Sequence, residues 1–260
     1  MDLRLRGRVA VVTGGSEGIG KGIAHRFLQE GAKTAICARR DDVLQKAAEE
    51  LRESTSGDLL AVSADVTKPE TLSNFINRVV EDFGRIDVLV NNAGRSATSA
   101  FDDLTDDAWY ADLDLKLMGA VRCARLVIPQ MKLNGGGRII NITHPGGKQP
   151  GAGSYPTSVS RAAGIAMTKA LSKELMPHNI LVNTVCLTSI KSAQGERAWK
   201  AEGSRGTLED YWIERAQEHP LGRLGEPSDA GALVAFLASE WASFITGTAI
   251  NLDGGLSNVV

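Results

Sequence analysis

Residues 8–20 read RVAVVTGGSEGIG, an apolar run followed by a glycine-rich turn. The run Arg8–Thr13 predicts a buried β-strand, and residues 18–30 predict a helix because their apolar side chains recur at four-residue spacing. Glycines between a strand and a helix let the backbone approach a pyrophosphate, which the free N–H groups at the helix start then bind. The stretch therefore predicts a dinucleotide-binding turn, and a plain strand-to-helix connection is the alternative.

The rest of the chain continues the alternation of short apolar runs and longer helical patterns. Further strands are predicted at 33–38, 59–63, 86–90, 138–142, 180–185 and 249–252. Further helices are predicted at 41–54, 69–83, 156–176 and 227–239, with one or two over 105–133. Strands that are apolar on both faces form parallel sheets with helices on both sides. We therefore predict an α/β protein, a single-domain Rossmann fold over residues 1–260 with a doubly wound, seven-stranded parallel sheet.

One stretch interrupts this alternation. Residues 188–218 are polar and irregular, and they carry Trp199, Tyr211 and Trp212. A long insertion between a strand and the last helix of such a fold often covers the site. The stretch 188–218 is therefore predicted to be a lid, and its aromatic side chains favour a small, partly apolar substrate.

The composition excludes several classes of function. The chain has 260 residues with 29 basic and 31 acidic side chains, and a net charge of -2 gives no reason to bind nucleic acid or an anionic membrane. No apolar run approaches the ~18 residues of a transmembrane helix, and the N-terminus lacks the apolar core of a signal peptide. Cys37, Cys123 and Cys186 are too widely spaced for a metal site and are typical of free core thiols. We predict a cytoplasmic protein that binds no metal.

Several short motifs lie outside the glycine-rich turn. They are Ala64-Asp65-Val66, Asn91-Asn92-Ala93-Gly94, Asn183 within LVNTV, and the tail Thr246-Gly247 with Asp253-Gly254-Gly255. Together with TGGSEGIG at 13–20 they resemble the short-chain dehydrogenase/reductase family over nearly the whole chain. The resemblance implies a Rossmann fold, a small-molecule substrate and a homotetramer whose interfaces use the helices at 105–133 and 156–176.

The resemblance also implies which residues hold the cofactor. Asp65 would contact the adenine, Ile190 the carboxamide and Ser192 the pyrophosphate. After the sixth strand the family commonly has Pro-Gly, whereas this chain reads Cys186-Leu187. The implied cofactor-binding residues outside the second strand are Gly14, Ser16, Gly18, Ile19, Gly20, Asp65, Val66, Asn92, Ala93, Gly94, Arg161, Ile190 and Ser192.

The end of the second strand indicates which dinucleotide is bound. NAD enzymes usually place an acidic residue there, bound to the ribose 2′-OH. This chain has Ala38 followed by Arg39 and Arg40, and guanidinium groups match the 2′-phosphate of NADP. Glu17 favours the opposite, and a solvated helix entry is the alternative for the arginines. We predict NADP as the cofactor, with NAD possible.

The catalytic end departs from the family pattern. The family uses a tyrosine, a lysine four residues later, a serine and an asparagine for general acid–base catalysis around hydride transfer. Tyr155 is followed at the fourth residue by Val159, so the Tyr-x-x-x-Lys pair is absent. The stretch RAAGIAMTK at 161–169 resembles the family segment that starts at the lysine. This register implies the replacements Arg161 for lysine, Thr157 for tyrosine, His144 for serine and Lys116 for asparagine.

The replaced positions still contain groups that titrate. His144 is expected to transfer a proton or polarise the carbonyl, and Lys116 to act if desolvation lowers its pKa. Thr157 is far too weak an acid to replace a lysine-activated tyrosine, so its loss is expected to be tolerated. Arg161 is expected to bind the ribose without releasing a proton. Tyr155, on the lead-in to the helix, is the rival proton donor. The structural alternatives are a surface histidine, an ion-paired lysine and a packing tyrosine.

These features predict an NADP-dependent oxidoreductase that interconverts a secondary alcohol and a ketone through an atypical proton relay. The intact cofactor motifs and the titratable replacements favour it. The alternative is a dinucleotide-binding protein without redox turnover, which acts as a sensor, a scaffold subunit or a non-redox enzyme. The loss of both tyrosine and lysine favours that alternative, and the fold does not decide between the two.

Overall fold

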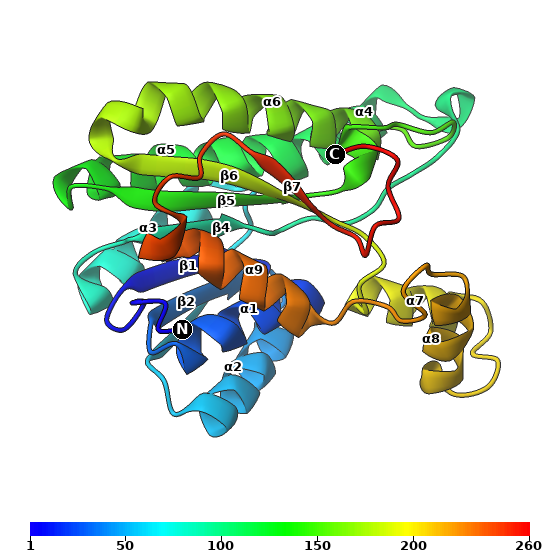
Figure 1. Ribbon diagram of the computed structural model, residues 1–260, viewed down its shortest axis with the longest axis horizontal. Coiled ribbons are helices and arrows are strands. Elements are labelled where there is room, and N and C mark those ends of the chain that lie inside the picture. Colours follow the sequence, from blue (N-terminus) through cyan, green and yellow to red (C-terminus); the bar gives the residue numbers. More distant parts are fainter.

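A seven-stranded parallel sheet in the order β3-β2-β1-β4-β5-β6-β7 forms the centre of the computed structural model, which describes residues 1–260 (Figure 1). The strands are β1 (Val9–Thr13), β2 (Lys33–Ala38), β3 (Leu59–Ser63), β4 (Val88–Asn91), β5 (Gly137–Thr143), β6 (Ile180–Leu187) and β7 (Ala249–Leu252). Each pair of neighbours is parallel. Every strand lies within two residues of its predicted bounds, so the predicted Rossmann fold is confirmed.

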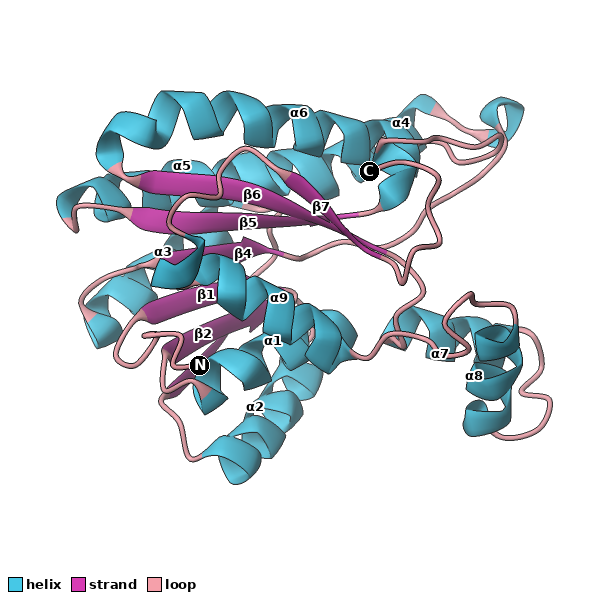
Figure 2. Ribbon diagram, in the orientation of Figure 1, coloured by secondary structure: helices cyan, strands magenta, loops and turns pink.

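Helices cover both faces of the sheet (Figure 2). They are α1 (Gly18–Gln29), α2 (Asp41–Thr55), α3 (Pro69–Phe83), α4 (Asp106–Leu113), α5 (Gly119–Leu133), α6 (Thr157–Leu175), α7 (Ala193–Ala201), α8 (Leu208–Gln217) and α9 (Pro227–Ala238). One buried cluster joins α1, α2 and α9 to the sheet, and a second joins α3 and α5 to the other face. Phe27 and Phe75 are fully buried in these two clusters, and a side chain of this size contributes about 1.5–3 kcal/mol when buried.

The predicted helical region at 105–133 is one continuous helical path with a change of pitch in its middle. Helix α4 passes into a π-helical turn, Asp114–Met118, which passes directly into α5. Such turns rotate the following side chains around the helix axis and often occur at functional sites. Here the turn carries Lys116, whose side chain is buried.

Residues 188–218 form helices where the sequence predicts an irregular stretch. Helices α7 and α8 lie to one side of the sheet (Figure 1) and pack against each other through Trp199, Tyr211 and Trp212. The missed signal was a capping box, in which Thr207 and Asp210 satisfy each other's backbone N–H groups at the start of α8. The prediction of irregular structure was therefore wrong, because local capping and a small aromatic cluster stabilise two helices. No helix is long and apolar enough to span a membrane.

The strand order reverses between β1 and β4, and ligands of open α/β sheets bind at the carboxyl ends of the strands beside such a reversal. The Thr13 hydroxyl, at the end of β1, accepts the backbone N–H groups of Asn92 and Ala93, both at 3.1 Å. These bonds join the glycine-rich turn to the segment after β4. The sheet therefore brings the two predicted cofactor segments to one edge.

Candidate active site

The glycine-rich turn has a shape that side chains would fill. Gly14 and Gly18 have positive φ angles of 68° and 50°, and a Cβ atom at Gly20 would overlap the carbonyl oxygen of Gly14. Helix α1 starts at Gly18, and the side chain of its N-cap residue, Glu17, makes no capping hydrogen bond. The first N–H groups of α1 are thus left for a ligand, and helix starts of this kind bind phosphate. The turn therefore fits a dinucleotide pyrophosphate.

The other predicted cofactor residues gather around this turn. Asn92 Nδ2 donates to the carbonyl oxygens of Thr13 and Gly14 at 3.0 and 3.1 Å. Asp65 accepts hydrogen bonds from the backbone N–H and hydroxyl of Thr67, and the adjacent Val66 is buried. Gly94 packs against the guanidinium of Arg161, Ser192 lies beside Gly18, and Ile190 forms a β-bridge with Gly225. Ser16 and Ile19 belong to the turn and to α1.

The two arginines after β2 have different surroundings. Arg40 pairs with Glu17 at 2.5 Å, and Glu17 also lies 3.6 Å from Arg197 of α7. Arg39 is exposed and forms no ion pair. The charge of Arg40 is therefore balanced by Glu17, whereas that of Arg39 remains free for an anionic ligand.

Two of the four residues that the sequence predicts to be catalytic touch each other. Lys116 Nζ donates to the hydroxyl of Thr157 at 2.8 Å and forms a buried ion pair with Asp112. The other carboxylate oxygen of Asp112 accepts the hydroxyl of Ser160 at 2.7 Å. The sequence analysis missed Asp112 and Ser160. The i,i+4 spacing of Asp112 and Lys116 on a predicted helix is a signal that could have found the pair.

Burial changes the proton affinity of Lys116. Burial lowers the pKa of Lys116 to about 8. The hydrogen bond that Lys116 donates to Asp112 opposes this effect, and the positive charges of Arg161 and Arg95 reinforce it. A lysine in this range exchanges its proton near neutral pH. The desolvation that the sequence analysis required is therefore present.

The imidazole of His144 has a defined tautomer. Its Nδ1 accepts the backbone N–H of Gly146 at 2.8 Å, so Nε2 carries the proton, and Nε2 lies 3.2 Å from the hydroxyl of Thr188. Partial burial, followed by the charges of Arg161 and Lys116, holds the pKa of His144 below its ordinary value. The ring is thus neutral at pH 7, with an Nε2–H that donates a hydrogen bond. His144 as a whole remains open to solvent.

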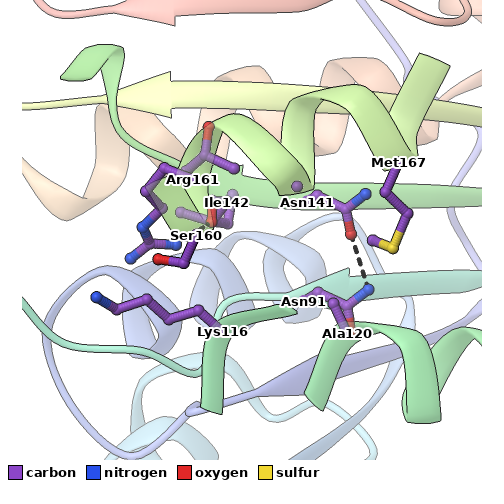
Figure 3. Close-up of a pocket in the computed structure, with 10 residues that line it drawn as sticks. Asn91, Lys116, Ala120, Asn141, Ile142, Ser160, Arg161 and Met167 are labelled. Atoms are coloured by element: carbon purple, nitrogen blue, oxygen red, sulfur yellow. Dashed lines mark hydrogen bonds between the residues drawn. The ribbon is translucent and has the colours of Figure 1, made fainter. Parts of the chain in front are cut away.

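Arg161 faces Lys116 across a small pocket (Figure 3). Its Nη1 donates to the carbonyl oxygen of Ile142 at 2.7 Å, and its buried Nε has no hydrogen-bond partner. Figure 3 shows Arg161, Ser160 and Lys116 turned to the same side of the pocket, with the Asn91–Asn141 hydrogen bond of 2.8 Å at the opposite end. Two cations, Lys116 and Arg161, therefore line the pocket, and Lys116 is paired with Asp112.

Tyr155 lies outside this cluster. Its backbone is extended and accepts the N–H of Ser99 at 2.8 Å, and its ring packs against Phe101 and Trp109 with centroid distances of 5.7 and 6.1 Å. Its hydroxyl makes no hydrogen bond to the four replaced positions. The geometry favours the packing alternative for Tyr155.

Comparisons with known proteins agree with this site. A family model described as enoyl-(acyl carrier protein) reductase matches residues 14–257. The 3-oxoacyl-(acyl-carrier-protein) reductase FabG of Thermotoga maritima is 34% identical over 98% of this chain and 99% of its own. The chain belongs to the short-chain dehydrogenase/reductase family. It is an NAD(P)-dependent oxidoreductase of that family.

Two solved structures are especially informative. L-sorbose reductase from Gluconobacter frateurii, complexed with NADPH and L-sorbose, is 34% identical, with full coverage of both chains and a TM-score of 0.94. An NADPH-bound short chain oxidoreductase from Pseudomonas aeruginosa PAO1, described as containing an atypical catalytic center, is 32% identical. It covers 97% of this chain and 98% of its own, with a TM-score of 0.90. The family thus includes a member described as having an atypical catalytic center.

Proposed function

We propose that this protein is an NADP-dependent oxidoreductase that interconverts a secondary alcohol and a ketone with an atypical proton relay. One observation carries the proposal: Lys116 and Thr157 are hydrogen-bonded to each other, and they are two of the four residues, with His144 and Arg161, that the sequence predicts at the family's catalytic positions. Burial lowers the pKa values of three of the four, Lys116, His144 and Arg161, and neighbouring positive charges lower those of Lys116 and His144 further. Perturbed titratable groups in one cluster are typical of catalytic sites.

The bound dinucleotide supplies or takes up the hydride, and the residues of the glycine-rich turn would hold it. NADP is favoured over NAD because Arg39 is exposed and unpaired beside the position where NAD enzymes carry an acid. The NADPH-bound neighbours support the same choice. Arg161 and the Asn92–Gly94 segment complete the cofactor site.

His144 would polarise the substrate carbonyl. A neutral imidazole that donates through Nε2 serves as an electrophile without giving up its proton. Thr188 now receives that N–H, and a substrate oxygen would take its place. Arg161 adds a positive charge that stabilises negative charge on the oxygen as the reaction proceeds.

The proposal also includes a lid, an assembly, a cellular compartment and a class of substrate. Helices α7 and α8 would act as a lid, because Gln194 on α7 accepts the backbone N–H of Ser96 at 2.8 Å beside the cofactor segment. A homotetramer is supported by the family, and a reducing cytoplasm by three free, buried cysteines. The substrate is a small, partly apolar carbonyl compound.

A turnover assay tests the proposal. NADPH absorbance is followed with cyclohexanone, ethyl acetoacetate and a 3-oxoacyl thioester, beside calorimetric titrations with NADPH and NADH. We expect oxidation of NADPH by at least one ketone, and tighter binding of NADPH than of NADH. Tight cofactor binding without turnover of any ketone would favour the alternative, a binding protein without redox activity.

A further inference from the structure

The hydroxyl of Thr157 can interact with a ligand only as a hydrogen-bond donor. It accepts the Nζ–H of Lys116 at 2.8 Å and the backbone N–H of Ala97 at 3.1 Å. A hydroxyl offers two lone pairs and one proton, so both of its acceptor sites are occupied. No group of the protein accepts its proton. A ligand at this position therefore meets a hydrogen-bond donor.

We propose that Thr157 and Lys116 form the proton relay of the active site, in which Thr157 protonates the substrate oxygen and Lys116 replaces the proton. The inference rests on the proposed ketone reduction. It changes the expectation for Thr157, because a threonine that is too weak an acid by itself becomes a competent donor when a cation reprotonates it in the same step.

Two protons move together in this step, one from Thr157 to the substrate oxygen and one from Lys116 to Thr157. A new O–H bond forms on the substrate oxygen as the Oγ–H bond of Thr157 breaks, while an Nζ–H bond of Lys116 breaks and reforms the Thr157 hydroxyl. Lys116 is left as a neutral amine, and a proton that enters through the pocket it lines restores the ammonium before the next turnover. The carbonyl carbon is reduced by the hydride of NADPH, and the alcohol is oxidised by the reverse sequence.

The other candidates fit the proton source less well. The Nε2–H of a neutral His144 is a hydrogen-bond donor but a poor acid, and a guanidinium such as Arg161 holds its protons near pH 7. Lys116, with its pKa lowered to about 8, exchanges its proton readily. Asp112 positions it: one carboxylate oxygen binds Nζ and the other binds Ser160, which fixes the carboxylate.

The first experiment measures turnover and its pH dependence with NADPH and the ketones named above. Thr157→Val should lower kcat by about 10²–10⁴, the usual range for a lost general acid, while Thr157→Ser should stay close to wild type. In the reductive direction kcat should fall as pH rises through about 8, because the fraction of Lys116 that is protonated falls. Lys116→Met should lose this pH dependence. The titratable and charged groups that interact electrostatically with Lys116 are Asp112, Arg161, Arg95 and His144.

The second experiment needs no turnover. The side-chain ammonium of Lys116 is followed by NMR in protein carrying ¹⁵N-lysine, and its resonance is assigned by its loss in Lys116→Met. We expect a midpoint well below the ~10.4 of an ordinary lysine, and a shift of that midpoint in Thr157→Val. Ser158→Ala is the matched control, because Ser158 is the next buried hydroxyl on the helix and has no hydrogen-bond partner. It should change neither the titration nor kcat.

The outcomes separate the relay from the proposed function. If none of the tested ketones is reduced by NADPH in the presence of the wild-type protein, the proposed function fails. The NMR titration still tests the coupling of Lys116 to Thr157 in that case. A Lys116 midpoint that is ordinary, or that ignores Thr157→Val, would overturn the relay. So would a Thr157→Val variant that turns over like wild type.

Discussion

At the residue scale, the tautomer of His144 determines what the side chain contributes. Its Nδ1 is occupied by the N–H of Gly146, so only the Nε2–H faces a ligand. His144→Ala should lower kcat by about 10²–10³, the range for loss of one oxyanion-type donor, with NADPH affinity nearly unchanged. Steady-state kinetics and a binding titration measure the two effects separately.

Tyr155→Phe is the control for that prediction. The Tyr155 ring packs against Phe101 and Trp109, and phenylalanine keeps this packing. The variant should retain the kcat of wild type. If Tyr155→Phe abolishes turnover while His144→Ala does not, the lead-in to α6 carries the proton and the assignment of His144 is wrong.

Arg39 is expected to recognise the 2′-phosphate. Because its charge has no partner, Arg39→Ala should weaken NADP binding by about 1–3 kcal/mol, the range for a lost charged hydrogen bond, and leave NAD binding nearly unchanged. Arg40→Ala should weaken NADP binding less, because Arg40 is paired with Glu17. Isothermal titration with both cofactors checks this, and equal losses for NADP and NAD would refute the role of Arg39.

Site residues could be predicted where their position depends on spacing along the chain. Roles that depend on side-chain contacts could not be predicted. The register from RAAGIAMTK at 161–169 predicts the four altered positions from the sequence alone. It did not show that Gly146 fixes the tautomer of His144, or that Asp112 holds Lys116. Those facts depend on loop conformation and helix pitch, which sequence spacing does not specify.

At the scale of elements, the continuous path of α4, the π-helical turn and α5 supports the buried pair of Asp112 and Lys116. Asp112→Asn leaves Lys116 without its counter-charge, and removal of one partner of a buried pair destabilises a protein by about 3–5 kcal/mol. Urea unfolding should show this loss, and the pKa of Lys116 should fall further, since the Asp112 hydrogen bond raises it.

Glu196→Gln is the matched control for Asp112→Asn. Glu196 pairs with Lys200 at the same i,i+4 spacing, at 2.7 Å, but on the exposed surface of α7. Exposed helix pairs contribute about 0.3–0.5 kcal/mol, so this variant should unfold almost like wild type. Equal losses for the two variants would mean that burial does not govern the energetics of the Asp112 pair.

Elements of the fold were predicted well because apolar runs and helical periodicity are local properties. The central strands follow this pattern closely, since β1, β4, β5 and β6 are buried between two helical layers. Residues 188–218 were mispredicted because their helices are short and largely polar, and their stability comes from caps and from the Trp199–Trp212 cluster. The π-helical turn leaves no periodic signature that a sequence would reveal.

At the scale of the whole molecule, exposed apolar side chains lie on the helices where the predicted tetramer would have its interfaces. Tyr110 on α4, Met118 on the π-helical turn and Val159 on α6 are exposed, and these are the helices that the sequence predicts at the interface. Light scattering at micromolar concentration should give the mass of a tetramer. Val159→Glu should shift the protein towards smaller species, whereas the mass of a monomer for wild type would refute the assembly.

The buried pair of Lys116 and Asp112 also constrains how this protein can evolve. Replacement of Lys116 by the asparagine typical of the family leaves the buried carboxylate of Asp112 without a counter-charge. Replacement of Asp112 leaves the buried ammonium of Lys116 without one. Either single change removes about 3–5 kcal/mol from a total stability that is ordinarily only about 5–15 kcal/mol. Conversion of this site to the tyrosine–lysine pair typical of the family therefore requires coupled substitutions at Lys116 and Asp112.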